Sequence, residues 1–165
     1  MIALLVSRDD IVKFTAVSGN TDTDKFIQFV KIAQDTHIQN YLGTKLFEKI
    51  NDGIVNSNLA EPYLSLLNTY IKPMAIHWAM VEYLPFSAYQ IANKGVYKHS
   101  AENSETVDKS EIDFLIEKQR SIAEHYTRRF IDFICFNSST YPEYNANTQD
   151  DMFPDTKADF SGWYI

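Results

Sequence analysis

The side chains that could perform chemistry are few and scattered in this sequence. The four histidines, His37, His77, His99 and His125, form no HExxH pair, and no Glu is followed three residues later by His. The spacings typical of zinc proteases and of carboxylate-rich di-iron bundles are therefore missing. The chain also contains no GxSxG, GxGxxG, P-loop or CxxC motif. We expect no catalytic residues, no metal site and no cofactor.

Two ionisable groups in one apolar segment still need an interpretation. His77 lies near Glu82 among apolar residues, which favours a buried histidine with a satisfied partner over a ligand or a general base. A small helical metal protein that uses His77, Glu82 and His125 stays open as the weakest alternative. The single cysteine, Cys135, allows no internal disulfide, and its apolar neighbours predict a small buried side chain.

The composition is that of one helical domain. The chain has 165 residues, of which 45% are hydrophobic, and only five are Gly and five are Pro. So few turn-forming residues argue against an all-β fold. The net charge of −7 disfavours a protein that binds nucleic acid by neutralising phosphates. The most apolar stretch, 73–92, contains His77, Glu82 and Pro85, so we predict no membrane span.

Apolar residues at three- and four-residue steps predict an all-α fold of about six helices within a domain of residues 1–136. Ser7 and Asp10 resemble a capping box, Gly43 is placed as a helix C-cap, and Pro85 predicts a kink in an apolar central helix. The polar stretch 94–107 is expected to contain a short hairpin. The helices are expected at about 8–15, 24–41, 44–53, 62–70, 73–93 and 108–136.

The last 29 residues, 137–165, have no helical period. They carry five carboxylates against one lysine, together with several aromatic residues. This mixture predicts an extended C-terminal arm that docks on another protein, because a solvated tail would contain few aromatics. An arm folded back over its own domain, or a frayed terminus, remains the alternative. The expected partner-binding residues are Tyr141, Tyr144, Phe153, Phe160, Trp163, Tyr164 and Ile165.

Five segments together resemble a known family. They are SRDDIVKF (7–14), SGNTDTDKF (18–26), YLGTKLFEKI (41–50), YIKPMAIHWAMVEYL (70–84) and TYP (140–142). In this order they resemble the head–tail connector, or adaptor, proteins of tailed phages that infect Bacteroides-type hosts. The resemblance covers roughly residues 4–142.

The resemblance implies an all-helical subunit of a closed homo-oligomeric ring, commonly of about twelve copies, that is stacked on the portal protein. Such a ring extends the channel for genomic double-stranded DNA, which passes without sequence-specific binding. It also offers a platform for tail or further ring proteins. In this family a C-terminal arm often inserts into the portal. The implied location is the head–tail junction of the virion, after assembly in the host cytoplasm.

The leading hypothesis is therefore a structural virion component and not an enzyme. The acidic composition suggests a channel lined with carboxylates that repel DNA phosphates. The alternative hypothesis is a monomeric helical adaptor or regulatory module that binds one protein partner.

Overall fold

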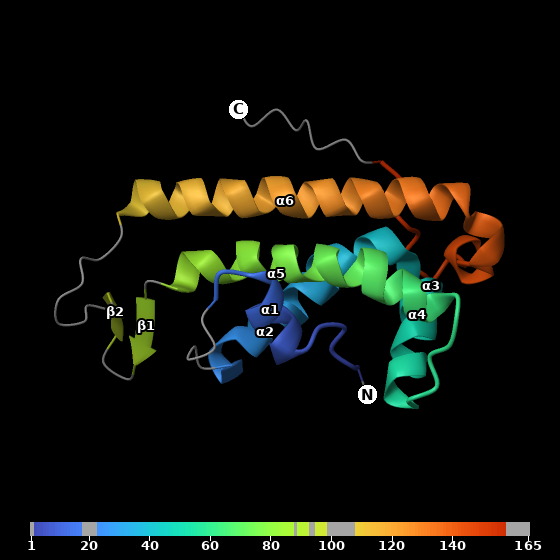
Figure 1. Cartoon of the computed structure of the whole chain (residues 1–165), viewed down its shortest axis with the longest axis horizontal. Coiled ribbons are helices and arrows are strands. Elements are labelled where there is room, and N and C mark those ends of the chain that lie inside the picture. Colours follow the sequence, from blue (N-terminus) through green and yellow to red (C-terminus); the bar gives the residue numbers. More distant parts are fainter. Residues whose placement is uncertain (1, 18–22, 88, 93–94, 99–107, 158–165) are drawn as a thin grey trace.

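Two long antiparallel helices, α5 (Lys72–Ser87) and α6 (Lys109–Phe136), run along the length of the molecule (Figure 1). The structure is a computed structural model that describes residues 2–17, 23–87, 89–92, 95–98 and 108–157. Helix α5 packs most extensively on α6 and next on α2. The helical elements before α5 are α1 (Arg8–Phe14), α2 (Thr23–Ala33), the π-helical turn η1 (Gln34–Ile38), α3 (Gln39–Val55), α4 (Tyr63–Leu66) and the π-helical turn η2 (Leu67–Ile71).

The starts of α1 and α6 follow from local sequence. The Ser7 hydroxyl accepts from the backbone N–H of Asp10 at 3.2 Å, and the Asp10 carboxylate accepts from the N–H of Ser7 at 3.0 Å. This reciprocal pair is the predicted capping box, and Asp108 and Glu111 form a second one at the start of α6. Two N–H groups that would otherwise lack partners are satisfied at each helix start.

Helix α5 is the central element of the core. Its residues Met74 to Ile76 and Trp78 to Val81 are buried, which confirms the prediction of an apolar central helix. The Trp78 indole N–H donates to the Thr127 hydroxyl of α6 at 2.9 Å, inside the core. Burying a large side chain of this kind contributes about 2–3 kcal/mol. The seam between α5 and α6 therefore carries much of the stability of the fold.

The end of α5 differs from the prediction. The helix ends at Ser87, two residues after Pro85, and not near residue 93. Strand β1 (Tyr89–Ala92) follows and pairs antiparallel with β2 (Gly95–Lys98), so that Tyr89 lies opposite Lys98. Proline lacks the N–H that would bond one turn back, which weakens the helix at this point. The predicted hairpin is therefore present earlier in the chain, and residues 99–107 lie outside the described part.

Two further sequence predictions need correction. The helix breaks at Gly43 as predicted, but its ψ of 166° at a φ of 72° lies outside the left-handed helical region of the predicted C-cap. Helix α3 then continues to Val55. Cys135 is exposed and not buried. Its neighbour Ile134 points fully into the core, and a helix turns by about 100° per residue. Within the described residues, no helix has the length and apolar character needed to cross a membrane.

Candidate functional site

The chain turns back onto its own domain after α6. Two short 3₁₀ turns, η3 (Ser138–Thr140) and η4 (Pro142–Asn145), follow the helix, and η4 packs on α3. Tyr141 and Tyr144 are each only 3% exposed. The Tyr141 ring meets the Tyr63 ring edge-on at 5.5 Å, and the Tyr63 hydroxyl donates to Glu143. Tyr141 and Tyr144 are therefore core residues, which corrects the expectation that they bind a partner.

The next residues form a strap, 147–155, that seals the helix break at Gly43. After the break, the N–H groups of Thr44 and Lys45 have no partner one turn back. The strap supplies acceptors for both: Thr44 donates to the Met152 carbonyl at 3.0 Å, and Lys45 donates to the Asn147 side chain at 3.1 Å. The Met152 N–H donates in return to the Thr44 hydroxyl at 2.9 Å. The strap thus acts as a cap for the second half of α3.

A close approach at Gly43 fixes the end of the strap. A Cβ atom on Gly43 would lie 2.9 Å from Cδ of Pro154 and 3.1 Å from the Met152 carbonyl oxygen. The Asp155 N–H then donates to the Asn40 carbonyl at 2.8 Å. The site therefore depends on the missing side chain of Gly43. The helix break is visible in the sequence YLGTK, whereas the strap that covers it is not.

The other predicted partner-binding residues are placed differently. Phe153, within the strap, is 61% exposed. Phe160, Trp163, Tyr164 and Ile165 lie outside the described residues. The described part of the expected arm is consequently folded onto its own domain. Only Phe153 among the predicted residues in that part presents an aromatic surface to solvent.

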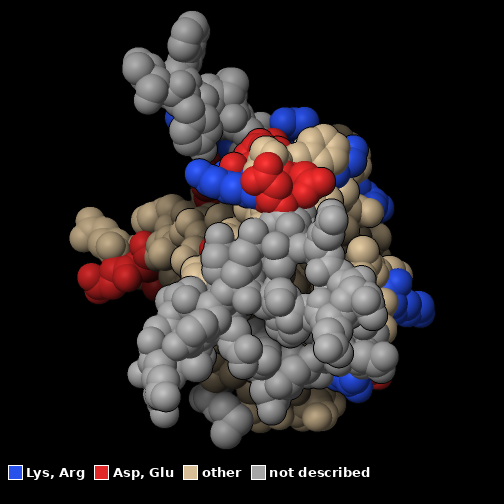
Figure 2. Space-filling view, turned by 90° about the vertical axis from the view of Figure 1, so that its left-hand side faces the viewer, with Lys and Arg blue, Asp and Glu red and all other residues tan. Residues whose placement is uncertain are grey.

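Further apolar side chains are exposed on α6. Phe136 at its end is 90% exposed, and Phe114 near its start is 69% exposed. Phe114 and Leu115 line a shallow depression of about 450 Å³ with Ser110 and Glu111. Figure 2 shows carboxylates gathered at this end of the molecule, where α6 begins. Single exposed apolar residues are common on protein surfaces, but a large aromatic ring that is almost entirely in water favours an interface.

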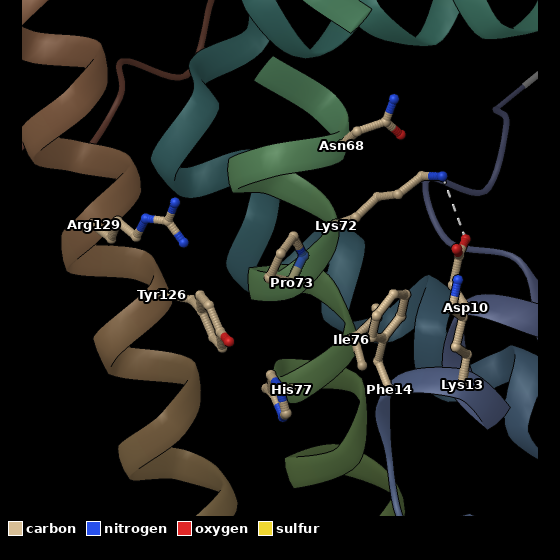
Figure 3. A pocket seen from close by; sticks show the side chains of 10 residues that line it. All are labelled: Asp10, Lys13, Phe14, Asn68, Lys72, Pro73, Ile76, His77, Tyr126 and Arg129. Carbon is tan, nitrogen blue, oxygen red and sulfur yellow. Dashed lines mark ion pairs between the residues drawn. The ribbon is translucent and has the colours of Figure 1, made fainter. Parts of the chain in front are cut away.

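A cavity that we call the basic pocket lies between α1, α5 and α6 (Figure 3). It has a volume of about 450 Å³, and its charged residues are Lys13, Lys72 and Arg129 against one carboxylate, Asp10. The Lys72 ammonium lies 3.4 Å from the Asp10 carboxylate. Burial alone would raise the pKa of Asp10, but the Ser7 hydrogen bonds and the Lys72 charge outweigh it and lower the pKa. Asp10 is therefore ionised, and the pocket keeps an excess of two positive charges.

Aromatic rings flank the other two cations of the basic pocket. The Arg129 guanidinium lies 5.0 Å from the centre of the Tyr70 ring, and the Lys13 ammonium lies 5.3 Å from that of Phe14. Such stacking holds a cation in place without neutralising it. Phe14 itself also lines the pocket. The pocket consequently offers positive charge beside apolar surface, the combination that suits an acidic and partly apolar ligand.

The histidines of the predicted metal alternative do not converge. His77 Nδ1 lies 2.9 Å from the Gln119 carbonyl oxygen, and burial lowers the pKa of His77. Glu82 instead pairs with His37 at 2.8 Å. Positions 77 and 82 are about 140° apart around the helix, which explains why they have different partners. In the part of the chain that the structure describes, no group of three His, Cys, Asp or Glu residues could hold a metal ion.

The chain belongs to DUF6712, a family of unknown function, whose members match residues 38–154. The matched range begins at the last residue of η1 and includes both Gly43 and Pro154. The family region thus contains the helix break and nearly all of the strap that seals it. No curated protein and no solved structure matches the chain.

Proposed function

We propose that this member of DUF6712 is a structural subunit of a ring that connects the portal to the tail of a phage and extends the DNA channel. The five segments that resemble phage connectors support this proposal. Two of them have clear structural roles, since YLGTKLFEKI contains the break at Gly43 and YIKPMAIHWAMVEYL forms most of α5. The proposed location is the head–tail junction of the virion.

The observation that carries the proposal is the exposure of large aromatic residues at both ends of α6. Phe136 is 90% exposed and Phe114 is 69% exposed, on a helix of 28 residues. Such a helix is roughly 42 Å long. Burial of each ring in an interface would contribute about 2–3 kcal/mol. A subunit that meets neighbours at both ends of its longest helix suits a closed ring.

The C-terminal arm belongs to the proposal in a shortened form. Because residues 141–155 pack on the domain itself, the proposed docking segment comprises Phe153 and residues 158–165. This segment contains Asp159, Phe160, Trp163, Tyr164 and Ile165. Tryptophan and tyrosine are favoured as anchors in protein interfaces. In a ring of about twelve subunits, many weak arms would act together on the portal.

The decisive experiment measures the mass of the full chain alone and mixed with a purified portal ring, by light scattering and electron microscopy. The proposal expects a symmetric ring on the portal. A chain shortened after Lys157 is expected to lose portal docking while its unfolding free energy stays unchanged. A single copy per partner, or full docking by the shortened chain, would contradict the ring or the arm respectively.

One observation favours the second candidate, a monomeric helical adaptor. Residues 147–155 of the predicted arm are tied to their own domain through Thr44, Lys45 and Asn40, so less of the arm is left to dock on another protein. The adaptor would bind one protein partner through α6 and remain a single copy. The mass measurement with the portal distinguishes it from the ring subunit.

A further inference from the structure

We propose that the surface around the basic pocket of one copy contacts the surface around an acidic groove on the opposite flank of the next copy. Subunits would then associate head to tail. This inference rests on the proposed ring, because it names the surfaces by which its subunits would meet. Its occupant is a second copy of the same chain.

The acidic groove lies between the second half of α5 and the first half of α6. It encloses about 400 Å³ and is lined by Glu82, Asp113, Glu117 and Arg120, together with the apolar residues Val81, Pro85 and Ile116. The Arg120 Nε lies 3.4 Å from a Glu117 carboxylate oxygen, and Glu82 is bound to His37 at 2.8 Å. With histidine counted as neutral, three carboxylates and one arginine give the groove a formal charge of −2. The basic pocket has an excess of two positive charges and also has apolar walls. The two surfaces are therefore matched in charge and in character.

Helical geometry places the two surfaces on opposite flanks of α6. Ile112 marks the face of α6 that is buried in the core. At about 100° per residue, Asp113 and Arg129 lie about 160° apart around α6, on opposite sides of Ile112. The two surfaces also lie toward opposite ends of α6. One molecule can therefore use both at the same time, each toward a different neighbour.

Further carboxylates lie on the flank of the acidic groove. Burial, with the nearby charges of Asp155 and Glu124, raises the pKa of Tyr41 to about 12. Glu124 and Asp155 both act on Tyr41, and Glu124 falls on the same side of α6 as Asp113 and Glu117, near Arg120 and Arg128.

A match between two different surfaces of one chain has a consequence for symmetry. Such a heterologous contact does not close in a dimer; it generates a ring when the rotation between copies closes, and a filament when it does not. Charge complementarity also selects one orientation and disfavours contacts between like flanks. The charge distribution of a single subunit is thus suited to cyclic assembly.

Charge reversal on each side tests the inference in the full-length protein. The variant Lys13→Glu with Arg129→Glu turns the basic pocket acidic, and Asp113→Lys with Glu117→Lys turns the acidic groove basic. We expect each pair to weaken self-association at least tenfold in sedimentation velocity at low salt. The unmodified protein should dissociate as salt is raised, because exposed charges are screened. Melting followed by circular dichroism checks that each variant remains folded.

Combining all four substitutions provides the sharpest measurement. The chain then carries an acidic pocket and a basic groove, which are complementary again, so assembly is expected to return. A mixture of the two defective variants should also recover assembly, with the variants alternating, because both surfaces of each variant are opposite in charge to those of the other. As a matched control, Lys49→Glu with Lys109→Glu changes the net charge as much as the basic-pocket variant does, outside both surfaces, and should assemble like the unmodified protein.

The outcomes separate this inference from the ring itself. If none of the four charge reversals changes self-association, the proposed head-to-tail contact is overturned, while the proposal of a ring is not. Weakening by both pairs without recovery in the combined variant would also overturn that contact, since the two surfaces would then face other partners. A single copy at every concentration, and also with the portal, would overturn both proposals.

Discussion

Gly43 has a backbone conformation that other residues rarely adopt, and it lies directly against the strap. Its φ of 72° and ψ of 166° fall in a region that is essentially restricted to glycine. A Cβ atom would also lie 2.9 Å from Pro154 Cδ. We expect Gly43→Ala to lower the free energy of unfolding by about 2–4 kcal/mol, from backbone strain and from the displaced strap. Urea denaturation of both proteins measures the difference.

A shortened chain separates these two contributions. In a protein that ends at Ala146, the strap is missing and only the backbone strain opposes an alanine at position 43. The cost of Gly43→Ala should therefore be smaller in that background than in the full chain. Equal costs in both backgrounds would mean that the strap does not depend on the missing side chain.

His77 makes the stability of the fold depend on pH. Burial holds its pKa below the ordinary value of 6.5, and the bond to Gln119 only partly opposes this shift. As pH falls below 6.5, the unfolded chain takes up a proton at this ring before the folded chain does. The free energy of unfolding therefore falls as the pH is lowered through this range. Urea denaturation at pH 7.5 and pH 5.0 should show a smaller drop for His77→Gln than for the unmodified protein.

Gln119 provides the matched comparison for His77. Its side-chain carbonyl oxygen accepts a hydrogen bond from His77 Nδ1 and raises the pKa of that ring. In Gln119→Leu this opposing effect is lost, so the drop in stability between the two pH values should become larger. An unchanged drop in both variants would show that another group governs the dependence.

At the scale of elements, the strap and the residues after it should behave differently. Removing residues 158–165 leaves the hydrogen bonds at Thr44 and Lys45 and the buried Tyr144 in place. Removing residues 143–165 takes away Tyr144, Pro154 and the cap of α3 together. We expect the first truncation to change the unfolding free energy by less than about 0.5 kcal/mol. The second should cost about 3–5 kcal/mol, since the loss of a large buried aromatic side chain is of that size.

Thermal melting of the two truncated proteins checks this prediction. A domain boundary at residue 137, as the sequence suggests, would make the two proteins equally stable. The structure instead extends the folded unit to about residue 155. If the longer truncation melts like the full chain, the strap contributes nothing to the fold.

The sequence correctly predicted the features of the fold that depend on interactions between neighbouring residues. The capping box of Ser7 and Asp10 and the long helix that begins after Asp108 depend on neighbours within one turn, and both are present. The end of α5 was placed too late, because helical periodicity gives no sign that the chain pairs as a hairpin from Tyr89 onward. Boundaries that are set by pairing with a later segment are therefore the least visible in the sequence.

The site was harder to predict because it is built by distant contacts. Tyr144 and the strap meet α3, from which they are separated by about a hundred positions in the chain, as the bond from Lys45 to Asn147 illustrates. Their lack of helical period correctly indicated an irregular segment, but periodicity says nothing about which surface covers it. His77 and Glu82 were likewise paired by closeness in the sequence, although the helix turns them apart.

At the scale of the whole molecule, exposed aromatics should matter for assembly and not for folding. Phe114 and Phe136 contribute little to the core, since they are 69% and 90% exposed. Replacing both by serine is expected to leave the unfolding free energy of a single copy within about 0.5 kcal/mol. The same change should weaken self-association or portal docking by at least tenfold, since about 1.4 kcal/mol of lost burial suffices for that factor.

Val55→Ser is the control for this pair, because Val55 is also exposed, at 44%, but lies at the end of α3. It should assemble like the unmodified protein. Light scattering reports the mass of each variant, and urea denaturation at low concentration reports its fold. If Phe114→Ser with Phe136→Ser keeps full assembly, the two phenylalanine side chains are exposed without a partner. The monomeric adaptor then becomes the better account. If both assembly and folding fail together, the two phenylalanine side chains stabilise the fold of the single subunit. Their exposure then no longer supports an interface.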